Sequence, residues 1–153
     1  MKRWVYLIVW LALSLGAGVI GSQFRPDEWY LALQKPDWNP PGWIFAPVWT
    51  ALYLMMALAA WLVSIHGEHR SRRLPLTFFS LQLAANALWS WLFFGLHRPG
   101  YALADILILW VLLTVTMGLF YKARRAAGVL LLPYWLWVGF AAALNAAIWH
   151  LNG

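Results

Sequence analysis

Apolar side chains fill five long stretches of this chain, and short polar segments separate them. Each stretch is continuously apolar and does not alternate with a period of two, which indicates buried helices and not membrane β-strands. A bilayer core about 30 Å thick requires roughly 20 helical residues per crossing, and every stretch is long enough. The pattern predicts an all-α integral membrane fold, a bundle of five transmembrane helices at residues 4–22, 43–65, 74–96, 101–121 and 129–151.

The polar segments between the stretches carry the residue types that end helices. Proline, glycine and charged side chains are concentrated in residues 23–42, 66–70, 97–100 and 122–128. These connections leave no length for a second domain. We therefore expect residues 1–153 to form one membrane domain with a single long first loop, residues 23–42.

The first stretch follows Lys2 and Arg3 and in this respect resembles a secretory signal peptide. Its apolar run is longer than the core of a signal peptide, which has about 7–15 residues. It also carries Trp4, Tyr6 and Trp10, aromatic residues of the kind found at membrane interfaces. We expect it to be retained as the first span.

Composition supports lipid as the solvent of this chain. Hydrophobic residues make up 63% of the sequence, charged residues make up 10%, and the mean hydropathy is +0.66. Soluble domains are far more polar. The net charge of +6 does not indicate nucleic-acid binding, because the basic residues lie between apolar stretches and not along a stripe. The absence of cysteine excludes disulfides and thiolate metal sites.

Basic residues are distributed unequally between the two sides of the predicted bundle. The side of the N-terminus holds Lys2, Arg3, Arg70, Arg72, Arg73, Lys122, Arg124 and Arg125, and the other side holds Arg25, Lys35 and Arg98. Cytoplasmic loops carry the excess of lysine and arginine in membrane proteins. We therefore expect a multi-pass protein whose N-terminus is cytoplasmic and whose first loop and C-terminus lie outside.

Polar and aromatic side chains inside the spans indicate which helix faces look inward, since such groups are costly in lipid. Residues three, four or seven apart share a helix face. By this spacing the inward faces are Gln82, Asn86 and Trp89 in the third span, Trp49 and Tyr53 in the second, and Trp137, Ala141 and Asn145 in the fifth. Two interpretations remain open: the faces line an aromatic cavity, or the amides only hydrogen-bond between helices.

The remaining ionisable residues do not form a recognisable reaction centre. Asp105 follows the Pro99-Gly100 break closely, and we expect it to cap the helix or to pair with Arg98. The histidines do not form a metal-binding set, although haem ligation by His97 or His150 is an alternative. Nucleophile motifs, phosphate-binding glycine loops and paired carboxylates are missing from the sequence, which disfavours hydrolytic and phosphoryl-transfer chemistry.

Small residues recur at four-residue spacing in the first span. The pairs are Ala12 with Gly16, Ser14 with Gly18, and Ala17 with Gly21. Such faces allow close approach of a second helix. The second helix could belong to the same chain or to another copy, and we expect a homodimer.

Several motifs resemble those of the TspO/MBR family, the bacterial tryptophan-rich sensory proteins and the mitochondrial translocator protein, or peripheral benzodiazepine receptor. The first loop contains Gln34-Lys35-Pro36-Asp37-Trp38-Asn39-Pro40-Pro41-Gly42-Trp43, followed by Ala46-Pro47-Val48-Trp49-Thr50-Ala51-Leu52-Tyr53. Further matches are Gln82-Leu83-Ala84-Ala85-Asn86, Phe93-Phe94-Gly95, Ala102-Leu103-Ala104-Asp105 and Pro133-Tyr134-Trp135-Leu136-Trp137. The motifs occur in family order along essentially the whole chain.

The resemblance implies an internal pocket, closed by the first loop, that binds porphyrins such as protoporphyrin IX or haem and also drug-like hydrophobic molecules. No cofactor is required. By position the ligand-binding residues would be Trp49, Tyr53, Asn86, Trp89, Tyr101, Trp137, Ala141, Leu144 and Asn145. The mammalian cholesterol pattern, a tyrosine followed by lysine or arginine, is absent from residues 144–153, so the bacterial type in a cell membrane is the closer match.

Three functions follow as hypotheses. The first is a membrane receptor or sensory regulator that binds tetrapyrroles, with Arg25 or Lys35 of the loop near the propionates. The second is an enzyme that degrades porphyrin in light, with Trp49 and Trp137 as the catalytic residues, a role that some bacterial relatives imply. The third is a transporter of tetrapyrroles or lipids. Inverted repeats of secondary transporters are not evident, which disfavours the third.

Overall fold

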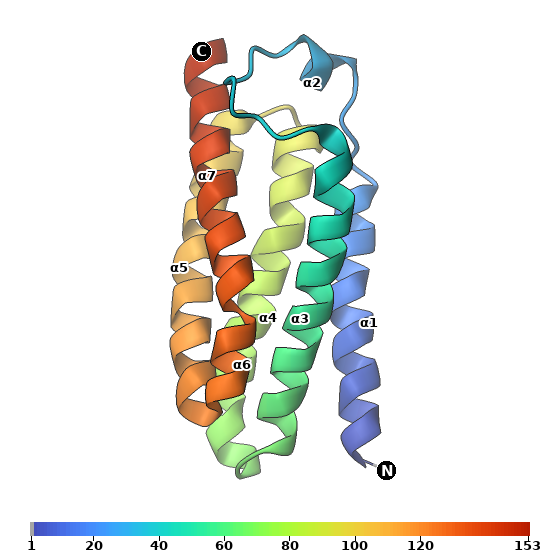
Figure 1. Cartoon of the computed structure of the whole chain (residues 1–153), viewed down its shortest axis with the longest axis vertical. Helices are drawn as coiled ribbons and strands as arrows, with labels where there is room; N and C mark the ends of the chain where they lie inside the picture. Colours follow the sequence, from blue (N-terminus) through green and yellow to red (C-terminus); the bar gives the residue numbers. More distant parts are fainter. Residues whose placement is uncertain (1) are drawn as a thin grey trace.

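Helices make up nearly all of the computed structural model, which describes residues 2–153 and contains no strand within that range (Figure 1). The elements are α1 (Lys2–Ser22), α2 (Glu28–Ala32), the 3₁₀ turn η1 (Gly42–Ile44), α3 (Phe45–Ile65), α4 (His69–Ser90), the π-helical segment η2 (Trp91–Gly95), α5 (Pro99–Ala123), α6 (Arg125–Leu130) and α7 (Leu132–Asn152). Five helical stretches are long and apolar enough to cross a membrane. The predicted five-span all-α fold is confirmed.

Three helix ends differ from the predicted ones, because charged residues extend the helices past the apolar stretches. The third span begins at His69 and not at residue 74, directly after Glu68, whose backbone is extended. The segment predicted as a break at 122–128 is helical except for Arg124. Arg124 has φ −158° and ψ 122°, an extended conformation that separates α5 from α6. A single extended residue is therefore enough to turn the chain.

The fifth span consists of two helices joined at Leu131. Pro133 lies in the first turn of α7, where its missing N–H leaves no hydrogen bond unmade. Gly128 lies near the end of α6, against the last turns of α5. A Cβ atom at Gly128 would lie 2.7 Å from Cα of Tyr121, so only glycine fits this crossing without a shift.

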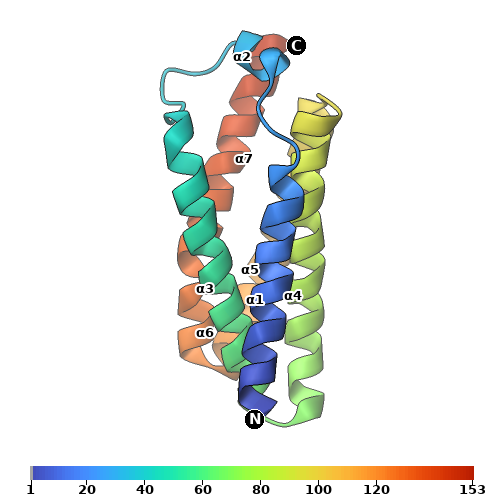
Figure 2. The same ribbon diagram turned by 90° about the vertical axis from the view of Figure 1, so that its right-hand side faces the viewer.

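The helices pack into a bundle in which α1 lies against α3 and α4, and α5 lies against α4 and α7 (Figures 1 and 2). The centre is filled by large side chains such as Met56, Phe79 and Leu113, all fully buried. Ala59 and Ala60 of α3 are also fully buried and keep that helix close to its neighbours. The first span is thus an integral part of the bundle.

The small residues of α1 have partners within the chain at two positions. A Cβ atom at Gly18 would lie 2.7 Å from the ring of Tyr53, and one at Gly21 would lie 3.1 Å from Oγ of Ser90. Gly16 has no such neighbour within 4 Å. Part of the small-residue pattern therefore serves packing inside the bundle, and the homodimer stays a prediction.

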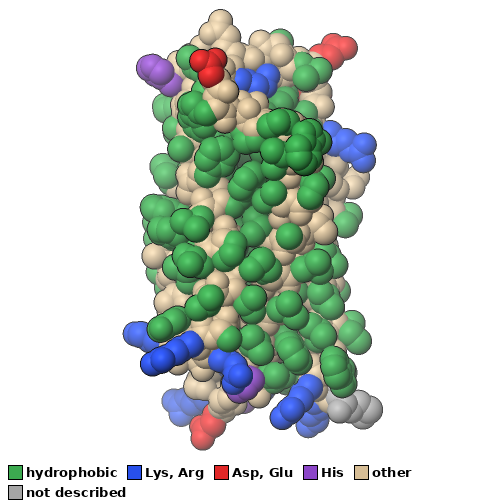
Figure 3. Space-filling view, viewed as in Figure 1, with side chains coloured by type: hydrophobic (Ala, Val, Ile, Leu, Met, Phe, Trp, Pro, Cys, Tyr) green, Lys and Arg blue, Asp and Glu red, His purple; other side chains and the backbone are tan. Residues whose placement is uncertain are grey.

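Charged side chains gather at the two ends of the bundle, and most Lys and Arg side chains lie at the end of the N-terminus (Figure 3). Between the ends the visible surface is covered by hydrophobic side chains. The N- and C-termini lie at opposite ends (Figure 1). The chain is a multi-pass integral membrane protein, and which end faces the cytoplasm stays a prediction.

Candidate functional site

The first loop closes the end of the bundle opposite the N-terminus, and the short helix α2 gives it a fixed shape (Figures 1 and 2). Asp27 begins α2 because its side chain accepts a hydrogen bond from the backbone N–H of Tyr30, 3.2 Å away. The extended backbone of Leu33 ends the helix after one turn. Aromatic residues of α2 are thereby directed onto the bundle.

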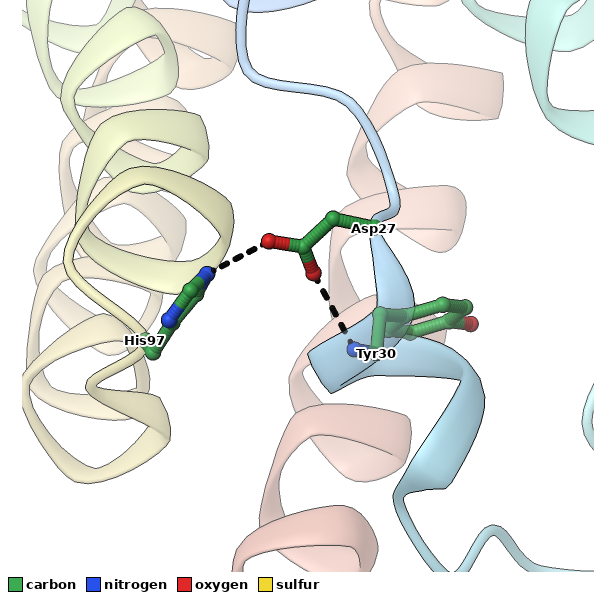
Figure 4. A network of polar contacts seen from close by, with 3 residues as sticks. All are labelled: Asp27, Tyr30 and His97. Atoms are coloured by element: carbon green, nitrogen blue, oxygen red, sulfur yellow. Dashed lines mark hydrogen bonds and ion pairs between the residues drawn. The ribbon is translucent and has the colours of Figure 1, made fainter.

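A contact between Asp27 and His97, which is an ion pair when the histidine is protonated, joins the loop to the segment between the third and fourth spans (Figure 4). Nε2 of His97 lies 2.9 Å from Oδ2 of Asp27, and the indole of Trp29 stacks on the His97 ring with 4.3 Å between centroids. His97 has a φ of 54°, which is uncommon for a residue with a side chain. The N–H of Tyr30, followed by His97, holds the pKa of Asp27 below its ordinary value of 3.8.

Aromatic packing and two hydrogen bonds of an amide side chain also hold the first loop against the end of the bundle. The ring of Tyr30 packs edge-on against Phe93 and Phe94, with centroid distances of 6.3 and 5.4 Å. Burial beneath these rings raises the pKa of Tyr30 above 10.0. At the far side of the loop, Asn152 of α7 accepts from the N–H of Gln34 at 3.0 Å and donates to its carbonyl at 2.8 Å.

The Asp27 contacts predict a pH dependence for the loop. Because the pKa is lowered in the folded loop, the stabilising effect of the carboxylate is complete above 3.8 and is lost as the pH falls through the lower folded value. Hydrogen exchange of peptides covering residues 24–34, corrected for intrinsic rates, should show protection that falls severalfold as the pH drops below 3.8.

Two substitutions separate the cap of α2 from the charge at Asp27. Asp27→Asn keeps a side-chain oxygen at the start of α2, so protection at neutral pH should largely remain while its acid dependence disappears. Asp27→Ala removes both contacts and should speed exchange at every pH. Equal pH profiles for Asp27→Asn and the wild type would contradict the role of the carboxylate.

A buried chain of hydrogen bonds links three spans beneath the loop. Tyr53 of α3 donates to Oδ1 of Asn86 in α4 at 2.6 Å. Nδ2 of Asn86 donates to the hydroxyl of Tyr134 in α7 at 2.8 Å. The Tyr134 hydroxyl in turn donates to Oε1 of Gln82 at 2.8 Å, and Nε2 of Gln82 lies 3.8 Å from the sulfur of Met56.

Asn145 of α7 forms a second polar junction nearer the loop. Its side-chain oxygen accepts from the indole N–H of Trp89 at 2.9 Å, and its Nδ2 donates to the carbonyl of Pro99 at 2.9 Å. Together with the Tyr134 chain, these bonds show that Gln82, Asn86 and Asn145 connect helices, and the lining of an aromatic cavity by the same faces stays a prediction. Their amides already have partners within the chain.

Two tryptophans predicted as ligand contacts pack on the core with part of each ring accessible. Trp49 lies against Tyr53 with 5.6 Å between ring centroids and edge-on to Tyr134 at 6.2 Å. Trp137 packs against Phe45 at 5.9 Å and Phe140 at 5.5 Å. The indole Nε1 of Trp137 is buried and has no hydrogen-bond partner. We call Trp38, Phe45, Trp137 and Phe140 the Trp137 cluster.

The structure brings together most of the residues predicted to bind a ligand. The bundle has two adjoining hydrophobic clusters, and eight predicted residues either pack in or against them or hydrogen-bond to a residue that does. They are Trp49, Tyr53, Asn86, Trp89, Trp137, Ala141, Leu144 and Asn145. Tyr101 does not join them: it is 66% exposed on α5. The neighbouring Ala102 faces inward instead.

Several residues of this region were missed by the sequence analysis. Tyr134 bridges Asn86 and Gln82, and its spacing of eleven residues from Asn145, three helical turns, is the signal that would have placed it on the inward face. Phe45 and Phe140 carry no polar group, so nothing distinguishes them from other apolar residues in the sequence.

The prediction that Asp105 caps a helix or pairs with Arg98 was wrong. Asp105 is 7% exposed, and its Oδ2 is buried without a hydrogen-bond partner. Among residues 2–153 the structure contains a single ion pair, Asp27 with His97, and it does not involve Arg98. Asp105 lies on the inward face of α5 with Ala102 and Ile106, so helical phase turns it away from the surface.

The fold and this region define a class of protein: a five-span helical membrane protein with an aromatic and amide-rich interior closed at one end by its first loop. The sequence pattern of the TspO/MBR family matches residues 7–150. The chain belongs to the TspO/MBR family, as its motifs indicate.

Named relatives cover nearly the whole chain. The Tryptophan-rich sensory protein of Cereibacter sphaeroides is 39% identical over 150 residues, which cover 97% of this chain and 92% of that protein. The Tryptophan-rich protein TspO of Chlorobaculum tepidum is 40% identical over 155 residues, covering 99% and 98%. The human Translocator protein is 38% identical over 147 residues, covering 93% and 86%.

Proposed function

We propose that this protein is a membrane receptor or sensory regulator that binds a tetrapyrrole, such as protoporphyrin IX or haem, beneath its first loop. Its relatives named as sensory and translocator proteins support a receptor role. The observation that carries the proposal is the buried indole N–H of Trp137, which has no hydrogen-bond partner within residues 2–153. A ligand carbonyl or carboxylate would supply the missing acceptor.

The surroundings of Trp137 favour a flat aromatic ligand. Phe45 and Phe140 present ring faces and edges close to the indole, and Trp38 of the loop packs on Phe140 at 5.7 Å. Ligand sites combine such apolar walls with a few polar groups that fix orientation. The same surfaces would accept hydrophobic drug-like molecules, which extends the proposal to those ligands.

Cations of the loop would accommodate the propionate groups of a tetrapyrrole. Nζ of Lys35 donates to the carbonyl of Leu33 at 3.2 Å and lies 4.5 Å from the ring centroid of Tyr30. Arg25 is exposed, and its Nε lies 3.4 Å from the carbonyl of Ser22. Neither forms an ion pair within residues 2–153, so both charges are free to meet a carboxylate.

The proposal predicts saturable quenching of tryptophan fluorescence by protoporphyrin IX. Trp137→Phe keeps an aromatic ring but removes the unpaired N–H, and should weaken binding about fivefold, the factor for one hydrogen bond of about 1 kcal/mol. Replacing both Trp49 and Trp137 by alanine should abolish saturation. Trp4→Phe is the matched control, because Trp4 is 64% exposed at the other end of the bundle and should leave the affinity unchanged.

The same samples distinguish binding from turnover. Light-driven loss of the porphyrin Soret band in the wild type, absent in Trp137→Phe, would assign the enzymatic alternative to this site, whereas equal loss in both would exclude it. Quenching without saturation in the wild type, or unchanged affinity in the double alanine variant, would overturn the binding site itself.

A further inference from the structure

Residues of α1 and of the first turns of α4 line a groove. The two helices lie side by side at the N-terminal end of the bundle, far from the first loop (Figure 2). The volume of the groove is about 270 Å³, and Val5 and Val9 of α1 face Leu76 of α4 across it. Trp10 and Ser64 also line the groove, and the indole N–H of Trp10 donates a hydrogen bond of 2.7 Å to Oγ of Ser64. Its surface is mainly apolar, and its charged rim is formed by Arg72 and Arg73 with His69.

A second, shallow and largely open groove runs along one face of α4 and meets the first at Arg73 and Leu76, which line both. Thr77 and Ser80 also line it, but their hydroxyls donate to carbonyls of their own helix at 2.8 and 2.9 Å. They consequently present carbon atoms to the groove. The two grooves thus share one arginine at the point where they meet.

The arginines at this junction form no ion pair within residues 2–153. Glu68 precedes α4 and is the nearest acidic residue in the sequence, and Arg70, Arg72 and Arg73 lie in the first turns of the helix. These charges are at the positive end of the helix dipole, where cations are disfavoured. The single ion pair of residues 2–153 lies at the opposite end of the bundle.

Contacts with Ser64 and Tyr6 fix the side chain of Arg72 at the groove. Its guanidinium donates to the carbonyl of Ser64, lies 3.3 Å from the hydroxyl of Tyr6, and lies 5.2 Å from the centroid of the Tyr6 ring. Arg73 is exposed beside it. The chain therefore fixes one arginine and leaves the other available to an external anion.

We propose that this junction binds one anionic diacyl phospholipid from the membrane leaflet at the N-terminal end. The phosphate contacts Arg73, with the charge of Arg72 behind it, and one acyl chain lies in each groove. A small soluble anion would use the arginines but not the apolar grooves. A zwitterionic lipid would fill the grooves but would bring its own cation toward the arginines. Basic pockets between spans are suited to anionic head groups.

Native mass spectrometry of the protein in detergent micelles tests the proposal. We expect phosphatidylglycerol to bind with a stoichiometry of one and at least fivefold more tightly than phosphatidylcholine with the same acyl chains. Arg73→Gln should weaken phosphatidylglycerol binding about fivefold, the factor for one basic residue near an anionic surface. Arg125→Gln is the control: this arginine is exposed and lies outside both grooves, so affinity should not change.

Two further measurements separate the head group from the acyl chains. Ser80→Trp fills the second groove and should weaken phosphatidylglycerol without affecting the arginines, whereas glycerol 3-phosphate should not compete. The proposal is overturned if both phospholipids bind equally, if Arg125→Gln weakens binding as much as Arg73→Gln, or if Ser80→Trp leaves affinity unchanged. Competition by glycerol 3-phosphate would instead indicate a site for soluble phosphates and would also overturn it.

Discussion

Gly128→Ala is expected to destabilise the bundle by about 1–3 kcal/mol, the usual cost of an overpacked core. The added Cβ would lie 2.6 Å from Cβ, 2.7 Å from Cα and 2.9 Å from N of Tyr121. Two of these atoms are backbone atoms of α5, so a side-chain rotation cannot relieve the clash. The helices α5 and α6 would have to separate at the turn made by Arg124.

Gly118→Ala provides the matched control on α5. A Cβ atom there has no neighbour within 4 Å, and the backbone is helical. Alanine in place of glycine in a helix stabilises by roughly 0.5–1 kcal/mol. Unfolding titrations in mixed micelles should therefore move the two midpoints in opposite directions. A Gly128→Ala protein as stable as the wild type would show that α6 does not pack as described.

Asn86→Leu is expected to cost about 2 kcal/mol, because it breaks the central link between α3, α4 and α7. The substitution is similar in volume but removes the acceptor of Tyr53 and the donor to Tyr134. The hydroxyl of Tyr53 would then be buried without a partner, and such a group costs about 1–3 kcal/mol. The same unfolding titration measures the loss.

A double-mutant cycle identifies the cause of that loss. Tyr53→Phe removes one hydrogen bond and should cost about 0.6 kcal/mol, the average measured between membrane helices. In the double variant the Tyr53 hydroxyl is absent, so part of the Asn86→Leu penalty should disappear. Strict additivity of the two single effects would mean that the bond between Tyr53 and Asn86 contributes nothing to stability.

The spans were predictable because hydrophobic length is a direct requirement of the bilayer. Their ends were less so, since helix termini outside the hydrocarbon depend on local backbone geometry. Arg124 illustrates this: neither its charge nor its neighbours indicates that this one residue turns extended while Lys122 remains helical. Glu68 ends one connection in the same way, six residues before the apolar stretch begins at residue 74.

The sequence predicted which helix faces form the candidate site but not which residues of neighbouring helices contact one another. Helical spacing correctly grouped Gln82, Asn86 and Trp89, but spacing within one helix says nothing about which residue of another helix lies opposite. Tyr134 was therefore given only as part of a family motif and not as a residue of the site, although it hydrogen-bonds to both Asn86 and Gln82. Tyr101 came from the family resemblance alone. It precedes the buried Ala102 by one residue, which turns it by about 100° toward the outside.

The contact between Gln34 and Asn152 bears on how this protein should be engineered. Asn152 is the last helical residue of α7, and its side chain holds the backbone of the first loop at both the N–H and the carbonyl of Gln34. Only Gly153 would separate an affinity tag or fluorescent reporter joined after it from Asn152 and its two hydrogen bonds to Gln34. Reporters intended to leave the loop undisturbed belong at the other terminus, across the full length of the bundle.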